Sequence, residues 1–456
     1  MYSTNVNNFQ YNNYSTVGTV RKTSVSNPAD NKISPQPTVA NKTLCAFTGS
    51  QNAIQVRTEL ASHEEKTKYK ELLNVCPKDT KKQLNQLLKS GILLNSNSND
   101  KSTTLDNLYK IVKTPRAQGL SNIDILAQTV NALADPHVIT QQFGNIPDQY
   151  KIQTAKLNQG KAGEENVEHS GTCVASSIEF NLAQKYPAEF ARFAQGLSSP
   201  EMSVNKTIKL ANLADNTLDA VWLLNAFEVP YKANNFNNVE LTFAPDKNAI
   251  VRAHIQTIDK DKLERSSVDV LMQSTFMQIG SQQSYDTLTD KRTGKFNQND
   301  KGLIEFEKTF TESVVEDKNK ISVTYQTVDE NAKLVGYETD FATMKKQITD
   351  AINMGENVII GYTQINSDNT IINGHEITIT GIKKSPDGKL IFVCNDTDDN
   401  MSKPVEYTED YLLPKIHHAG LPQAVVGDEV KLVENWVEGL RTYKELKKKR
   451  LNVNLH

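Results

Sequence analysis

The sequence has few cysteines, and they do not follow the spacing of a disulfide framework or a zinc site. Only four occur in 456 residues, and they are widely scattered, at Cys45, Cys76, Cys173 and Cys394. Scattered cysteines of this kind are typical of a reducing compartment. No apolar segment of the signal-peptide type follows Met1. We therefore expect a cytoplasmic protein, or one secreted by a route that needs no signal peptide.

The sequence also lacks an excess of either charge and any long apolar run. Lys and Arg number 51 against 54 Asp and Glu, which gives a net charge of −3. This balance argues against a phosphate-coated partner. No stretch reaches the roughly 18 apolar residues of a membrane-spanning helix. We expect no nucleic-acid partner and no membrane span, and the composition leaves the oligomeric state open.

The first part of the chain divides into two regions by composition. Residues 1–44 are rich in Asn, Ser and Thr and hold a single acidic residue, Asp30. Such a segment buries too little apolar surface to fold alone, which predicts a disordered polar leader. Residues 45–150 instead show helical spacing of Leu and Ile, interrupted by Gly and Pro. This pattern predicts a helical N-terminal domain.

Cys173 stands where a helix is predicted to begin. It follows Gly171 and Thr172, and apolar residues then recur every four positions, at Val174, Ile178 and Leu182. Thr172 is the expected N-cap, which places the thiol at the positive end of the helix dipole and favours the thiolate. The alternative is a small buried cysteine on a core helix.

A predicted hairpin near the C-terminus brings a histidine beside Asn and Asp. After a predicted helix at 341–352 and a buried strand at 357–362, a strand over 374–382 carries His375 near its start. The returning strand, 389–394, ends at Asn395 and Asp396. An Asn or Asp beside an imidazole can orient it as a general base. Strand alternation lets only one of the two reach His375, and we favour Asp396.

The order of these residues resembles that of the papain-like cysteine peptidase superfamily. In that superfamily a Cys at a helix start is followed by a His on a strand and by an Asn or Asp on the next strand. The later segments look most like bacterial double-glycine peptidases, where an Asp orients the histidine, which matches Asp396. The papain pattern itself matches Asn395. Asn158-Gln159-Gly160 is similar to the Gln-Gly of papain, which implies that Gln159 is an oxyanion donor.

The resemblance implies an α+β, papain-like fold, in which the helix with the Cys packs on an antiparallel sheet with the His and the Asn or Asp. The peptidase domain would span 151–426, with an insertion at about 200–335, and a C-terminal helix would follow at 427–456. We expect the insertion to be a surface lobe beside the cleft, especially Gln282 to Asp300. Within it we predict helices at 210–227 and 268–279, and a strand at 249–257 that carries His254.

The implied function is hydrolysis of peptide or isopeptide bonds in a protein or peptide substrate by Cys173, His375 and Asp396 or Asn395. No cofactor or metal is implied. A transglutaminase-like acyl transferase and a non-catalytic protein of the same fold are the alternatives.

Two sequence motifs that resemble metal-binding sites lack the required ligands. A calcium loop at 297–302 would have Lys301 and Lys308 at ligand positions, and His375-Glu376 lacks the second histidine of zinc proteases.

Overall fold

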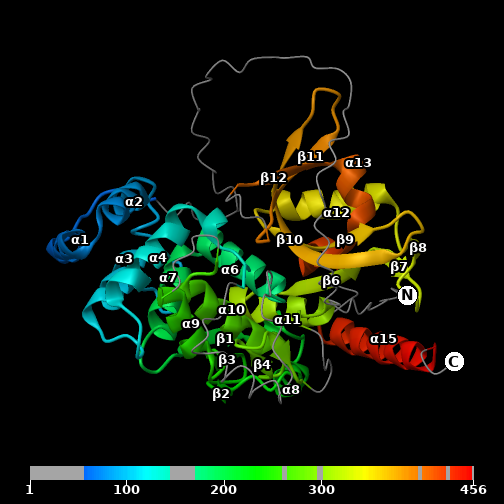
Figure 1. Cartoon of the computed structure of the whole chain (residues 1–456), viewed down its shortest axis with the longest axis horizontal. Coiled ribbons are helices and arrows are strands. Elements are labelled where there is room, and N and C mark those ends of the chain that lie inside the picture. Colours follow the sequence, from blue (N-terminus) through cyan, green and yellow to red (C-terminus); the bar gives the residue numbers. More distant parts are fainter. Residues whose placement is uncertain are drawn as a thin grey trace.

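A six-stranded antiparallel sheet in the C-terminal part of the chain lies against a larger helical part (Figure 1). The computed structural model describes residues 56–143, 170–258, 264–294, 301–398, 403–427 and 432–453. Helices and antiparallel sheets together confirm the predicted α+β class. None of the described helices combines the length and the apolar character needed to span a bilayer.

Helices make up the N-terminal part, as predicted for this region. They are α1 (His63–Val75), α2 (Lys78–Lys89), α3 (Thr104–Lys113), α4 (Asn122–Ala134) and the 3-10 helix η1 (Pro136–Val138). Capping boxes at Ser62 and Thr103 begin α1 and α3, because each hydroxyl accepts a backbone N–H three residues on. The predicted leader, residues 1–44, lies outside the described residues.

The middle of the chain adds more helices, a three-stranded sheet and a short hairpin. The helices are α6 (Cys173–Lys185), α7 (Pro187–Leu197), η2 (Leu210–Asn212), α8 (Thr217–Ala226), α9 (Ala249–Ile258), α10 (Ser267–Gly280) and α11 (Glu305–Glu316). The sheet is formed by β1 (Val204–Lys209), β2 (Tyr231–Ala233) and β3 (Asn238–Phe243), and the hairpin by β4 (Tyr285–Asp286) and β5 (Lys291–Arg292). The helix predicted at 268–279 is confirmed.

The strand predicted at 249–257 is wrong, because this segment forms α9. Its buried residues follow the helical spacing of three and four positions, at Ala249, Arg252, Ala253, Ile255 and Gln256. Of the alternating apolar residues Val251, Ala253 and Ile255, only the last two are buried, so a spacing of two does not describe the buried face. The predicted helix at 210–227 is confirmed only from Thr217, where Asn216 accepts the N–H of Asp219 and caps α8.

The remaining elements build the main sheet and its helices. The sheet order is β12 (Val405–Thr408), β11 (Leu390–Asn395), β10 (Ile371–Lys384), β9 (Val358–Ile365), β13 (Ile416–Pro422) and β6 (Lys320–Thr324). Around it lie β7 (Gln326–Val328), β8 (Leu334–Tyr337), α12 (Phe341–Asn353), α13 (Glu409–Leu412), η3 (Leu413–Lys415), α14 (Gln423–Val426) and α15 (Leu432–Val453). The predicted helix at 341–352 and the strands at 357–362, 374–382 and 389–394 are confirmed.

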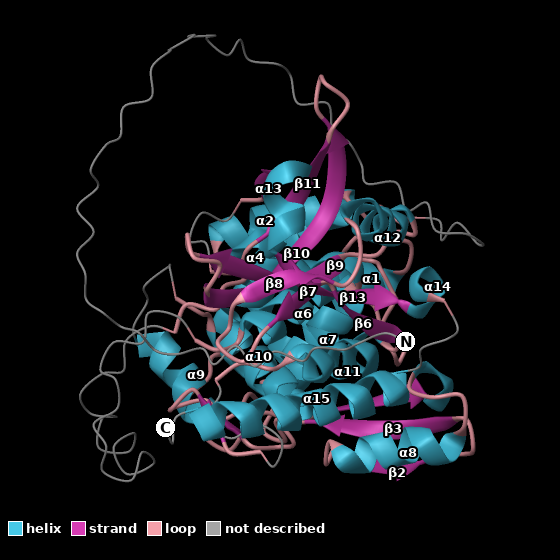
Figure 2. Cartoon of the chain, turned by 90° about the vertical axis from the view of Figure 1, so that its right-hand side faces the viewer, coloured by secondary structure: helices cyan, strands magenta, loops and turns pink. Residues whose placement is uncertain are grey.

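The main sheet is covered on both faces, which explains the continuous apolar run of β9. In Figure 2, β9, β10 and β13 lie between α12 and the helices α6, α7, α10 and α11. Ile359 belongs to the hydrophobic core of those helices, whereas Val358 and Ile360 belong to the core beneath α12. A strand buried on both faces has no polar alternation.

The sequence predicted that the block 200–335 is a surface lobe. This prediction is wrong, because much of the block belongs to the core. Every residue of α10 and α11 is buried, and β6 is an edge strand of the main sheet. Buried polar groups here bond to one another: Asp290 accepts hydrogen bonds from the Tyr285 hydroxyl (2.9 Å) and from the backbone N–H of Gly171 (2.8 Å). Around Asp290, polar residues therefore reflect internal hydrogen bonding.

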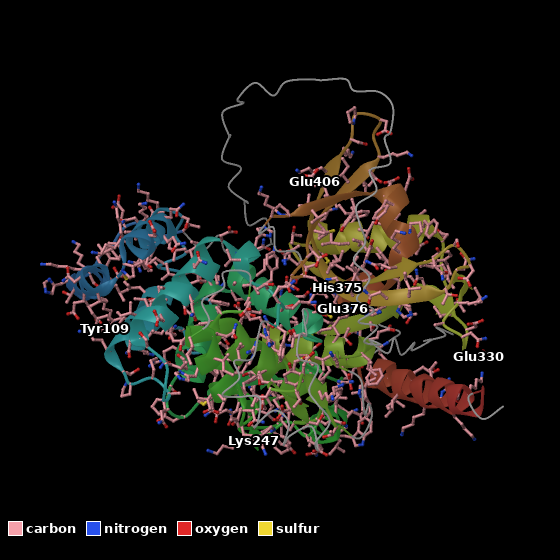
Figure 3. The ribbon with its side chains drawn as sticks, in the orientation of Figure 1. Tyr109, Lys247, Glu330, His375, Glu376 and Glu406 are labelled. Carbon is pink, nitrogen blue, oxygen red and sulfur yellow. The ribbon has the colours of Figure 1, made fainter. Side chains whose placement is uncertain are left out.

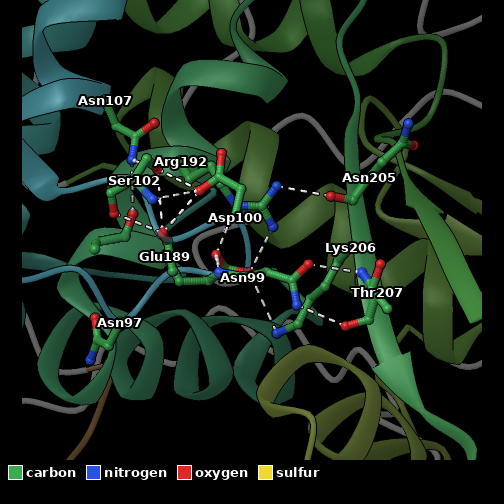
Figure 4. Close-up of polar contacts among 12 residues, drawn as sticks. Asn97, Asn99, Asp100, Ser102, Asn107, Glu189, Arg192, Asn205, Lys206 and Thr207 are labelled. Carbon is green, nitrogen blue, oxygen red and sulfur yellow. Dashed lines mark hydrogen bonds and ion pairs between the residues drawn. The ribbon is translucent and has the colours of Figure 1, made fainter. Parts of the chain in front are cut away.

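A buried polar network joins the N-terminal helices to α7 and β1 (Figure 4). The Glu189 carboxylate accepts two hydrogen bonds from Arg192, each 2.8 Å, and one from the Asn99 backbone N–H at 2.9 Å. The Asn99 amide pairs with both backbone groups of Thr207. The Lys206 ammonium group lies 3.5 Å from Glu189. Since buried charges require partners, this network fixes the position of the N-terminal part.

The C-terminal helix α15 packs back on the helical core. Its Trp436 is 2% exposed, and its ring lies 5.1 Å from that of Trp222 and 5.5 Å from that of Phe227. The helix predicted at 427–456 is confirmed over Leu432–Val453, and 428–431 and 454–456 lie outside the described residues.

Removal of the Phe276 ring should strongly destabilise the fold. The side chain is fully buried on α10, 5.8 Å from the Phe193 ring. Phe276→Ala should lower the free energy of unfolding by about 3–5 kcal/mol, because it leaves a cavity. The matched control is Phe236→Ala, since Phe236 is 85% exposed; it should change the value by less than about 0.5 kcal/mol. Urea unfolding measures both, and equal losses would contradict the packing described.

Candidate active site

The start of α6 holds the Cys173 thiol at the positive end of a buried helix. Thr172 occupies the N-cap position, but it makes no side-chain capping bond. Its hydroxyl instead donates to the Gln273 amide oxygen at 2.7 Å. Before it, Gly171 has no room for a side chain, because a Cβ would collide with Lys301. The predicted helix start and the predicted N-cap position of Thr172 are confirmed, although the Thr172 hydroxyl does not cap the backbone.

The His375 ring is hydrogen-bonded to Asp396. Its Nε2 lies 2.7 Å from the Asp396 Oδ1, and the same oxygen accepts the Asp398 backbone N–H at 2.9 Å. In the register of β10 and β11, Thr378 lies opposite Asn395. Alternation therefore places Asp396, the next residue, on the same side of the sheet as His375. The two side chains are largely buried, with 12% and 19% exposed.

The Cys173 thiol completes the group, because it lies within hydrogen-bonding reach of the His375 ring. Burial alone would lower the pKa of His375. The charge of Asp396, its hydrogen bond and the contact with Cys173 outweigh burial and raise this pKa well above its usual value. Since Asp396 engages Nε2, Nδ1 is the ring nitrogen left for the thiol. A protonated imidazole in this place is the partner that a thiolate requires.

Asn395 points away from His375. Its Oδ1 lies 2.8 Å from Nδ1 of His137, whose ring packs 5.2 Å from Phe180 of α6. Asn395 therefore connects η1 with the sheet. The structure brings Cys173, His375 and Asp396 together and separates Asn395 from them. Gln159, the predicted oxyanion donor, lies outside the described residues.

The other described thiols lie in different surroundings. Cys394 is fully buried on β11, as predicted, and burial with the nearby Asp396 charge raises its pKa strongly. Burial raises the pKa of Cys76 to about 11. Neither has an imidazole that the structure shows beside it, whereas Cys173 does. Cys45 lies outside the described residues.

A polar shell that the sequence did not reveal holds the turn after β11 against α6. The Ser176 and Thr397 hydroxyls are 2.7 Å apart, and the Gln141 backbone N–H donates to the Thr397 carbonyl at 3.0 Å. The Gln141 amide also donates to the Asp398 carboxylate at 3.0 Å. The acidic turn at 396–398 is thus bonded to protein groups. The run of polar residues after the strand, Asn395 to Asp398, was the sequence signal from which this hydrogen-bonded turn could have been predicted.

A second cluster lies on the main sheet beside His375. His417 and His418 of β13 and Glu305 of α11 are buried, and their ligand-type atoms lie within 4.8 Å of one another. They are the described residues that could hold a metal ion. Figure 3 shows the neighbouring His375 and Glu376 where the sheet meets the helical part. The pair of adjacent histidines was a sequence signal that the analysis of motifs missed.

The His375–Asp396 pair should make stability depend on pH. A histidine with a raised folded pKa stabilises the fold fully below its unfolded pKa of about 6.5, and this contribution is lost as pH rises through the folded pKa. Asp396→Asn should therefore destabilise the chain most near pH 6, and the deficit should shrink at higher pH. Urea unfolding over a pH series measures this. Glu330→Gln, at an exposed site, is the control, and a pH-independent deficit for Asp396→Asn would contradict the pairing.

Comparisons of the chain with protein-family models, with curated proteins and with solved structures returned no match. The chemistry of the site therefore has to be inferred from its own residues. These are a thiol at a helix N-terminus, an imidazole with a raised pKa and a carboxylate that orients it.

Proposed function

We propose that this chain is a cysteine peptidase that hydrolyses peptide or isopeptide bonds. The observation that carries the proposal is the alignment of Cys173, His375 and Asp396, with the imidazole between the thiol and the carboxylate. The three groups come from two distant parts of the chain. They would serve as nucleophile, base and orienting residue, which are the roles that acyl transfer requires.

Each group has a defined part in the proposed reaction. The Cys173 thiolate attacks the carbonyl carbon, and the imidazolium of His375 gives its proton to the leaving amine. A water molecule, activated by His375, then hydrolyses the thioester. Asp396 fixes the ring so that Nδ1 faces the sulfur. The backbone N–H of Cys173 at the start of α6 is a suitable donor to the oxyanion.

The polar surroundings favour a catalytic role over a non-catalytic one. Thr172 bonds to Gln273 of α10, and Gly171 bonds to Asp290 between β4 and β5. Ser176 bonds to Thr397 in the turn after β11, so the start of α6 is held against three other elements. If the contact were purely structural, apolar side chains would stabilise the fold at least as well, because burying an imidazolium and a carboxylate costs free energy. Transfer of the acyl group to an amine would pass through the same thioester, so the products distinguish it from hydrolysis.

Cys173 should react with iodoacetamide at neutral pH before Cys76 and Cys394 do. Its partner His375 supports the thiolate, whereas burial raises the pKa of each of the other two thiols. Peptide mapping by mass spectrometry over time gives the three rates. His375→Gln should slow the labelling of Cys173 and leave the others unchanged. If Cys76 were labelled as fast as Cys173, the proposal that His375 activates the Cys173 thiol would be wrong.

Asp396→Ala should lower kcat by about 10²-fold to 10⁴-fold, as expected when a catalytic imidazole loses its orienting partner. Asn395→Ala should retain most of the activity, since Asn395 bonds to His137. A peptide library screened with the wild-type chain supplies the substrate, and Cys173→Ala is the blank. Circular dichroism verifies the fold of each variant. Loss of activity in Asn395→Ala with retention in Asp396→Ala would reverse the assignment. No cleavage above the blank, with or without an added amine, would reject catalysis.

A further inference from the structure

We propose that Glu305, His417 and His418 form a site for a divalent transition-metal ion, with Zn²⁺ as the ion that this donor set favours. The three residues are 6%, 1% and 6% exposed. Glu305 is the first residue of α11, and the histidines are consecutive on β13. The site is separate from the Cys173 thiol and does not depend on its proposed activity.

The candidate donor atoms lie close together, within 4.8 Å of one another. Nδ1 of His417 lies 2.8 Å from Nδ1 of His418, and Nδ1 of His418 lies 4.0 Å from Oε2 of Glu305. The 2.8 Å contact is a hydrogen bond between the two imidazoles. Ligand atoms about 2.0–2.2 Å from one tetrahedral zinc ion lie about 3.4 Å apart, so binding would replace this hydrogen bond and move each pair by a few tenths of an ångström. Two imidazoles and a carboxylate are a donor set used by zinc and by non-haem iron sites, with positions left for water.

The free side of His418 is held by a carboxylate, as in many metal sites. In the sheet register, His418 lies opposite Gly361 of β9, and Gly361 lies opposite Glu376 of β10. A Cβ at Gly361 would collide with the His418 ring, so the ring crosses the strand over this glycine. Its Nε2 then lies 3.0 Å from Oε1 of Glu376. This contact is an ion pair and not a hydrogen bond, and it leaves Nδ1 as the nitrogen that would face the ion.

The Glu305 carboxylate is only half satisfied without an ion. Its Oε1 accepts hydrogen bonds from the hydroxyls of Ser322 (2.6 Å) and Thr324 (2.7 Å). Its Oε2 is buried and has no hydrogen-bond partner among the described residues. An unsatisfied buried carboxylate oxygen is costly, and a cation between it and the two imidazoles removes that cost. This oxygen is the independent indication of a ligand.

The local charge and space also suit a cation. The Lys308 ammonium group lies 3.3 Å from Glu376, so Glu376 balances it and the Glu305 charge stays available. A cavity of about 30 Å³ is lined by all three proposed ligands and by Gly361 and His375. This volume holds about one water molecule, which could complete the coordination of an ion.

The test is zinc binding by the full-length Cys45→Ser/Cys173→Ala chain, which removes two thiols that could bind zinc themselves. After chelation and dialysis, ZnCl₂ titrated against a chromophoric chelator should show about one tight site per chain. CoCl₂ should give the visible bands of a nitrogen- and oxygen-bound ion without thiolate charge transfer. Glu305→Gln, which preserves shape, and His418→Asn should each weaken binding at least about tenfold.

His254→Asn is the matched control, because His254 lies on α9 and bonds to the Gly119 carbonyl. It should bind zinc like the parent chain. Circular dichroism confirms that each variant folds, and zinc should raise the melting temperature of the parent and not that of Glu305→Gln. Absence of a zinc site in the parent overturns the proposal, and so does unchanged affinity in Glu305→Gln. Cobalt bands that disappear in a His375→Gln variant and persist in His418→Asn would assign the ion to the other site and also overturn it.

Discussion

The burial of α6 from Cys173 to Ala183 is the constraint on which the arrangement of the described parts of the chain depends. All of its residues from Cys173 to Ala183 are buried, although the helix carries Ser176, Glu179 and Asn181. A polar side chain in the interior needs a partner, and each partner comes from a different element. Ser176 bonds to the turn after β11, Glu179 to Gln273 of α10, and Asn181 to Asn357 just before β9. The hydrogen bonds of one helix thereby fix the helical part against the sheet.

This arrangement explains how residues far apart in the chain meet. The helical part presents the thiol, and the sheet presents the imidazole with its carboxylate. The short turn at 396–398 serves both, because Asp396 bonds to His375 while Thr397 bonds to Ser176. The distance between sulfur and ring is therefore set by hydrogen bonds of neighbouring residues in one turn. Among the described residues, the site is thus positioned by helices, strands and one short turn.

Local sequence patterns predicted the elements that carry the site, because strand alternation and helix starts are local properties. The strands around His375 and the helix start at Cys173 were predicted on that basis, and so was the opposite direction of Asn395 and Asp396. The sequence-based predictions failed where tertiary packing determines the structure. A spacing of two in α9 occurs within a helix as well as in a strand, and the polar residues near Asp290 are satisfied inside the protein. The proximity of Glu305 to His417 and His418 depends on the pairing of β6 with β13, which no local pattern encodes.

The burial of Cys173 also bears on the chemical lifetime of its sulfur. The residue is 1% exposed, whereas its partners His375 and Asp396 keep part of their surface in contact with solvent. Thiolates beside an imidazolium are readily oxidised by peroxide when solvent reaches them, first to the sulfenic acid and then irreversibly. A sulfur enclosed by protein atoms is protected from that sequence while the enclosure is intact. Under the proposed peptidase activity, any opening that admits a substrate to Cys173 would also expose the sulfur to oxidants.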